Sequence, residues 1–190
     1  MKKMKKFLLT ALAALVTFSS CGGALADAEL PYTTYNYDYW GDIVYTPAAY
    51  VPAGSITGAS FQYNGQSLGA FKNPQDLCVA QDGTVYLADS GNNRIVVTDS
   101  GFSKATRIYD KLKTADGETT LKDPEGIYVS RETQCMYIAD TGNSRLLVCD
   151  LDGNVQLELT RPDSTLYENE TFKPQKVVVD KAGNIYMVLN

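Results

Sequence analysis

The chain of 190 residues contains no histidine, and several other residue types are scarce or unevenly placed. Histidine is the commonest general base near neutral pH and the commonest transition-metal ligand, so its absence narrows the chemistry available. The four cysteines include no C-x-x-C pair, which argues against a cysteine-bound zinc ion. Lysine and arginine are missing from residues 27–70. After residue 26, no segment has the apolar periodicity of a helix.

Residues 1–26 are predicted to be a signal peptide, because a basic start precedes the apolar run Phe7 to Phe18, which is too short to span a bilayer. The favoured processing of the signal peptide is cleavage at the A-x-A site Ala24-Leu25-Ala26. The alternative is a lipid anchor at Cys21, because Phe18-Ser19-Ser20-Cys21 resembles a bacterial lipobox. Either form of processing predicts a secreted or cell-surface protein outside the bacterial cytoplasm.

The chain that follows residue 26 is acidic, with 13 basic and 22 acidic side chains and a formal charge of -9. Nucleic acids and anionic membranes are bound by basic surfaces. We therefore expect no nucleic-acid partner, and membrane contact only through the signal peptide or an anchor at Cys21.

A sequence repeat of 50 residues dominates the rest of the chain. Each copy opens at a proline, Pro74, Pro124 or Pro174. The first two copies also contain Asp-[Ser/Thr]-Gly-Asn-[Asn/Ser]-Arg, at Asp89 to Arg94 and at Asp140 to Arg145, and the third reaches Asn190 before its Asp. A repeat of this length indicates a solenoid or a propeller.

Within a copy the apolar residues alternate with a period of two, which predicts strands. Turn residues such as Gly91-Asn92 and Gly142-Asn143 predict hairpins, because Gly and Asn accept the positive φ of tight reversals. The second copy is expected to form four antiparallel strands, at residues 126–130, 135–140, 145–150 and 155–159.

A four-stranded sheet that is apolar on both faces needs neighbours, and radial stacking of such sheets gives an all-β fold, the β-propeller. WD40 blades require Gly-His and Trp-Asp, but the chain has no histidine and its one tryptophan, Trp40, precedes the repeats. Kelch blades require Gly-Gly within the repeat, and here the pair Gly22-Gly23 lies in the leader.

The run from Pro74 to Ile95, with its second copy at Thr141 to Arg145, resembles the NHL repeat. The resemblance covers residues 71–190 and implies four-stranded blades starting near 74, 124 and 174. NHL repeats commonly build six-bladed, TolB-like propellers, so about two and a half blades are present. We expect the chain to be an N-terminal fragment, with assembly of partial propellers as the alternative.

Residues 27–70 are rich in tyrosine, and Tyr35, Tyr37 and Tyr39 alternate as on one face of a strand. The favoured interpretation is that this segment packs on the propeller or closes it. The alternative is a stacking platform for sugar rings or peptide.

The repeated turn is expected to be scaffold rather than an anion or metal site, because it recurs in each complete copy and its side chains can cap the turn backbone. Its residues are Asp89, Asn92, Arg94, Asp140, Asn143 and Arg145.

A second set of residues follows the prolines and differs between copies, as a site on a symmetric scaffold would. We expect these side chains at one mouth of a central channel, either as a ligand site or as solvated lining. Acidic and amide oxygens there would suit calcium or another hard divalent cation, although the metal is unknown. The residues are Gln75, Asp76, Glu125, Gln175 and Lys176.

Cys135 and Cys149 flank a predicted hairpin and are a possible disulfide pair. The alternative is that they and Cys78 are small buried hydrophobic residues.

The resemblance implies a non-catalytic binding module or scaffold for protein or carbohydrate, because NHL propellers are most often recognition surfaces, and no cofactor is evident. The alternative, implied by activities found on six-bladed propellers, is a metal-dependent lactonase- or lyase-like enzyme with its site on the channel.

Overall fold

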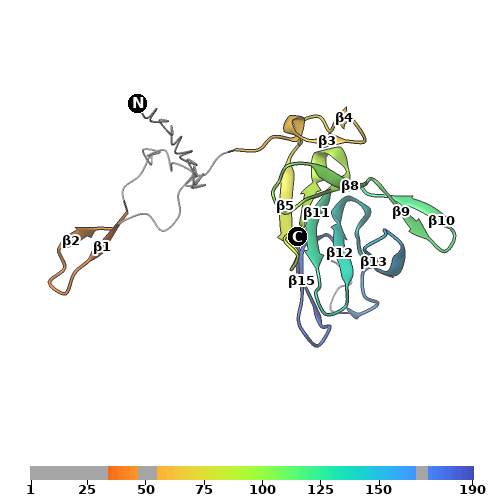
Figure 1. Cartoon of the computed structure of the whole chain (residues 1–190). Helices are drawn as coiled ribbons and strands as arrows, with labels where there is room; N and C mark the ends of the chain where they lie inside the picture. The colour runs from red at the N-terminus through yellow and green to blue at the C-terminus, as the bar shows by residue number, and fades with distance from the viewer. Residues whose placement is uncertain (1–33, 47–54, 166–170) are drawn as a thin grey trace, which may run out of the picture. The chain divides into compact units, whose positions relative to one another are not determined.

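The computed structural model describes residues 34–46, 55–165 and 171–190 (Figure 1). The chain divides into two compact units, Met1–Gly54 and Ser55–Asn190. The predicted signal peptide and Cys21 lie outside the described residues. In the part that is described, no helix has the length and apolar character needed to cross a membrane.

The second unit contains two four-stranded antiparallel sheets, each with its strands in chain order. The first blade consists of β5 (Pro74–Val79), β6 (Val85–Asp89), β7 (Arg94–Thr98) and β8 (Ala105–Tyr109). The second blade consists of β11 (Pro124–Val129), β12 (Cys135–Asp140), β13 (Arg145–Asp150) and β14 (Val155–Leu159). The predicted all-β, propeller-type architecture is therefore confirmed.

Three of the four strands predicted for the second blade have the expected bounds. The first strand begins two residues earlier than predicted, at Pro124, because a β-bulge between Pro124 and Gly126 lets the proline pair with Asp140. The same irregularity occurs at the start of β5 and of β15. Each bulge leaves one residue unpaired, here Gln75, Glu125 and Gln175.

The third copy forms a two-stranded sheet of β15 (Pro174–Val179) and β16 (Ile185–Leu189). The first strands of the three copies are neighbours, with β11 in contact with both β5 and β15. We call β5, β11 and β15 the inner strands.

Two apolar clusters fill the spaces between the sheets. The junction of the first and second blades buries Ala88 and Ile95 of one against Met136 and Ile138 of the other. The junction of the second and third copies buries Ala139, Leu146 and their neighbours against Val177 and Val179. The alternation seen in the sequence thus sends successive side chains of β12 to opposite junctions.

A short hairpin precedes each complete blade. The first is β3 (Gln62–Tyr63) with β4 (Gln66–Ser67), and the second is β9 (Lys111–Thr114) with β10 (Gly117–Thr120). The second hairpin was not predicted, although the Asp116-Gly117 dipeptide between polar strand-like runs is a signal for a reversal. Its Leu112 is buried in the junction of the first and second blades.

The tyrosine-rich segment divides between the two units. In the first unit, β1 (Tyr35–Tyr37) pairs with β2 (Ile43–Tyr45), and all six strand residues are exposed. In the second unit, the short 3-10 helix η1 (Gly58–Ser60) leads to Phe61, which is buried on the first blade beside Val96. Residues 55–70 therefore pack on the propeller, and a role for residues 27–54 in closing it stays a prediction.

The possible disulfide between Cys135 and Cys149 is wrong. In the register of β12 and β13, Cys149 pairs with Met136 and Cys135 pairs with Asp150, so the two cysteines are offset by one position in the strand pairing. They consequently lie on opposite faces of the sheet, one in each junction cluster, and both are free. Both are buried, whereas Cys78 is half-buried.

Candidate functional site

The repeated turn places a fully buried carboxylate at the centre of a hydrogen-bond network. Asp89 accepts the Lys72 backbone N–H at 2.7 Å, the Asn92 side-chain amide at 2.8 Å and Arg94 Nε at 2.7 Å. Asn92 and Arg94 in turn donate to the carbonyls of Ala70 and Leu68. The turn thus ties the segment before the blade to the blade itself.

The second blade repeats this network. Asp140 accepts the Lys122 N–H at 2.7 Å, Asn143 Nδ2 at 2.9 Å and Arg145 Nε at 2.8 Å. Arg145 also binds Thr119 and Thr120 at the end of the β9–β10 hairpin, so this arginine spans to a neighbouring segment. With every oxygen of the carboxylate engaged internally, the geometry is that of scaffold.

The turn conformation corrects one detail of the prediction. The chain reverses through two 3-10 turns, η2 (Ser90–Asn92) and η3 (Thr141–Asn143), and the left-handed residues are Asn93 and Ser144 rather than the glycines. Gly91 and Gly142 are required for a different reason. A Cβ on Gly91 would lie 2.8 Å from the Lys72 carbonyl oxygen, and one on Gly142 would lie 2.7 Å from that of Lys122.

The residues predicted for the channel mouth do come together, and we call them the inner-strand cluster (Gln75, Asp76, Glu125, Gln175, Lys176). The ammonium of Lys176 donates to the carbonyls of Gln75 and Glu125, each at 2.7 Å. It lies 3.7 Å from Asp76 Oδ2. One side chain of the third inner strand therefore contacts the starts of the other two.

The first and second inner strands are also linked by side chains of β5. Asp76 Oδ2 accepts the Ile127 N–H at 3.1 Å, and Cys78 Sγ accepts the Val129 N–H at 3.4 Å. Burial raises the pKa of the Cys78 thiol, and the nearby Asp76 carboxylate raises it further, while the Val129 N–H opposes both. The raised pKa favours the thiol form of Cys78, and the thiolate is the nucleophilic form, so this environment does not favour a role for Cys78 as a nucleophile.

A cavity of about 300 Å³ opens where the inner strands start, and we call it the strand-start pocket. It is lined by residues of all three copies, most of them polar. Glu125 and Gln175 of the inner-strand cluster line it, and Gln75, Asp76 and Lys176 do not. The lining that the sequence analysis missed includes Asn73, Ser90, Lys122, Asp123, Thr141 and Lys173.

Two of the missed residues carry backbone strain. Asn73 and Asp123 immediately precede the prolines and have φ of 48° and 44°. The left-handed region is unfavourable for residues with a Cβ, and Asn and Asp tolerate it better than most. Strained residues concentrate at ligand sites. In the first two copies, the Asn or Asp before the repeated proline was the sequence signal that could have identified these pocket residues.

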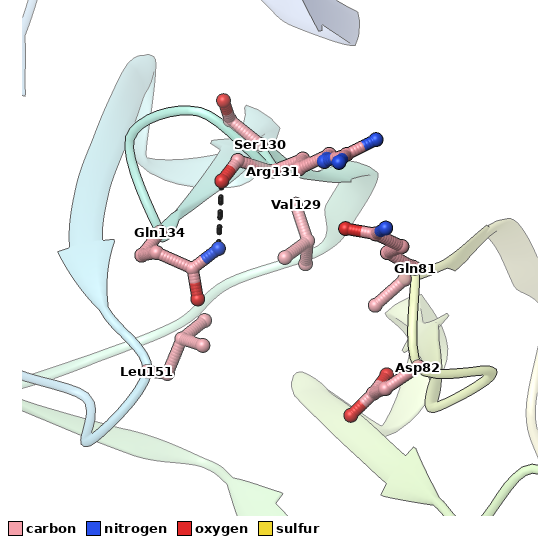
Figure 2. Close-up of a pocket in the computed structure, with 8 residues that line it drawn as sticks. Gln81, Asp82, Val129, Ser130, Arg131, Gln134 and Leu151 are labelled. Atoms are coloured by element: carbon pink, nitrogen blue, oxygen red, sulfur yellow. Dashed lines mark hydrogen bonds between the residues drawn. The ribbon is translucent and has the colours of Figure 1, made fainter.

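A second cavity, of about 410 Å³, lies at the other end of the inner strands, between the first and second blades. Figure 2 shows Gln81 and Asp82 on one side of it, across from Arg131 and Gln134. Gln134 donates to the Arg131 carbonyl at 2.6 Å, and Val129 and Leu151 supply apolar walls. No residue predicted for a site lines this cavity.

Comparison with known proteins identifies the repeat. Residues 71–100, which include β5, β6 and β7 of the first blade, match the NHL repeat. A search of curated proteins finds no match for the chain.

Solved structures similar to the chain include hydrazine synthase of Kuenenia stuttgartiensis, at 16% identity and a TM-score of 0.45, over 72% of this chain and 33% of that one. They also include a catalytically inactive virginiamycin B lyase of Staphylococcus aureus with quinupristin, at 15% identity and a TM-score of 0.44, over 83% and 42%. A streptogramin B lyase matches at 13% identity and a TM-score of 0.41, over 83% and 41%. The chain thus spans well under half the length of these structures.

Proposed function

We propose that this chain is part of an extracytoplasmic NHL-repeat propeller that acts as a non-catalytic binding module, with the strand-start pocket as its site. The observation that carries the proposal is the composition of that pocket. The residues on either side of the repeated proline line it, and they differ from copy to copy on a repeated backbone. They are Asn73, Asp123 and Lys173 before the proline, and Glu125 and Gln175 after it.

The chemistry of the pocket favours a polar ligand. Its side chains are amides, hydroxyls, carboxylates and ammonium groups, which bind the hydroxyl groups of a sugar or the backbone and charged groups of a peptide. Scaffold residues keep their identity from blade to blade, as Asp89 and Asp140 do, whereas the pocket residues beside the prolines change. This is the pattern of a site placed on a symmetric framework.

The test is a binding screen of the full chain against an array of oligosaccharides and a library of peptides. Glu125→Ala and Lys173→Ala should each weaken binding of a positive ligand at least about tenfold, the effect of losing one hydrogen bond to a charged group. Glu132→Ala and Lys181→Ala, at exposed positions outside the pocket, are the charge-matched controls.

Binding that both pocket variants leave unchanged would place the ligand elsewhere and contradict the proposal. Hydrolysis or elimination of a lactone or glycan that requires an added divalent metal would instead support the lactonase- or lyase-like alternative. The two outcomes are distinguishable, because binding is compared between wild type and the variants, whereas turnover is measured on the wild-type chain.

A further inference from the structure

The β-bulges at the start of the inner strands occur where two backbone carbonyls accept from one side chain. In each copy the residue after the proline is the one left out of the strand pairing. A bulged residue has no ladder partner, so its carbonyl is available for another donor or for a cation. The carbonyls of Gln75 and Glu125 both converge on Lys176 Nζ, at 2.7 Å each.

A carboxylate completes this set of oxygens. Asp76 Oδ2 lies 3.7 Å from Lys176 Nζ and is itself positioned by the Ile127 N–H, at 3.1 Å. The Asp76 side chain is 25% exposed and therefore only partly accessible to water. Its place is therefore set by the second blade and does not depend on the lysine.

Two carbonyl oxygens and one carboxylate are a donor set that suits a hard cation such as calcium. An ammonium group has three N–H donors and no acceptor, so it satisfies the same oxygens. Here the ammonium donates to the two carbonyls and forms an ion pair with the carboxylate at 3.7 Å.

We propose that the bulge carbonyls of Gln75 and Glu125, together with the Asp76 carboxylate, form a cation-binding site, and that Lys176 is its built-in cation. The lysine neutralises Asp76 and joins three copies of the repeat at one point. A metal cation takes the ammonium's place only when the lysine is removed. The site shares Glu125 with the strand-start pocket, but Lys176 and Asp76, whose substitutions test it, do not line that pocket.

The test is calcium binding by the full chain, measured by isothermal titration calorimetry. Wild type and Lys181→Ser, in which an exposed lysine is removed instead, should bind no calcium at this site. Lys176→Ser should gain one saturable calcium site, which raises its thermal midpoint. Adding Asp76→Asn to Lys176→Ser should remove that site.

Three results would overturn the proposal: equal calcium binding by wild type and Lys176→Ser, no binding by a folded Lys176→Ser, or binding that survives Asp76→Asn. If Lys176→Ser is recovered as folded protein only when calcium is present, the proposal is supported. If it fails to fold with and without calcium while Lys176→Arg folds, the cation is required but the metal does not replace it, and the proposal is wrong.

Discussion

The two complete blades share their turn but meet the next blade in different ways. Both donate a turn hydroxyl, Ser90 or Thr141, to the carbonyl of the following proline. The inner strands differ, because Asp76 of the first blade and Gly126 of the second occupy the same place opposite a buried alanine. Asp76 reaches forward to the second blade, whereas Gly126 leaves room for the third copy to approach.

This difference shows where the repeats of this chain vary. The turn networks and the apolar alternation hold each blade and are repeated almost residue for residue. The side chains at the start of each inner strand differ, and Asp76 and Lys176 use theirs to contact a neighbouring copy. That variation is what makes the same positions suitable for a binding site.

The largest expected effect comes from the feature that the blades share. Asp89→Ala and Asp140→Ala each remove a fully buried carboxylate that accepts three hydrogen bonds, one of them from a partly buried arginine, which should cost about 3–5 kcal/mol of unfolding free energy. Urea denaturation of the full chain measures the loss, with exposed Asp116→Ala as the control. A loss in either variant no larger than that of the control would contradict the scaffold role of the turn.

The next effect tests whether both junctions are equally well packed. Ile138 lies in the first junction and Leu146 in the second, and both are 0% exposed. Truncation of either to Ala should cost about 2–5 kcal/mol, since it removes buried contacts and leaves a cavity.

A matched control for these truncations exists within the repeat. Leu77 occupies the place of Ile127 in the first blade, but it is 55% exposed against 3% for Ile127. Leu77→Ala should therefore cost about 0.5 kcal/mol or less. Comparable losses for Leu77→Ala and Ile138→Ala would show that the blades do not pack as described.

A smaller effect is expected where the blades differ. A Cβ on Gly126 would lie 2.5 Å from the Gln175 carbonyl oxygen, so Gly126→Ala must move an inner strand and should cost about 1–3 kcal/mol. Asp76→Ala at the matching position only loses polar contacts, which is worth about 1 kcal/mol.

Gly101→Ala is the control for the glycine substitution, because nothing lies within 4 Å of its added Cβ. The same urea titration applies to all three variants. Equal stability of Gly126→Ala and Gly101→Ala would mean that the second junction does not require the close approach.

The sequence predicted the parts of this fold that depend on repetition. The alternation in Met136 to Ala139 and the turn at Asp140 to Arg145 recur in the first blade, and both gave the right strands. The β9–β10 hairpin was missed because it occurs outside the repeated core and its strands are mostly polar. The buried Leu112, which fixes it to the junction, is a single residue without periodicity.

The candidate site was predictable only in outline. Counting from the prolines brought together Gln75, Glu125 and Lys176, since equivalent strand starts in a propeller share one end. The bulges that orient their carbonyls are a backbone property with no side-chain signal. Likewise, the spacing of Cys135 and Cys149 left them opposite or one step apart, and only the register decided between opposite and same faces.

At pH 9 the smallest expected effect is the pH dependence contributed by Cys149, which the first junction buries completely. Burial, with a smaller contribution from Asp150, raises the pKa of this thiol to about 12 from an ordinary 9.0. Between those values the unfolded chain loses a proton that the folded chain keeps, so stability should fall as pH rises.

Tyr86, in the same junction, acts in the same direction, because burial raises its pKa to about 12 from 10.0. Urea midpoints measured from pH 9 upward should therefore decline less steeply for Cys149→Ala and for Tyr86→Phe than for wild type. Cys135→Ala, from the opposite face of the same strand pair, serves as the comparison variant, since its thiol lies in the second junction. A Cys149→Ala profile parallel to that of wild type would mean that water reaches the first junction. The two junctions would then differ only in how their inner strands make contact.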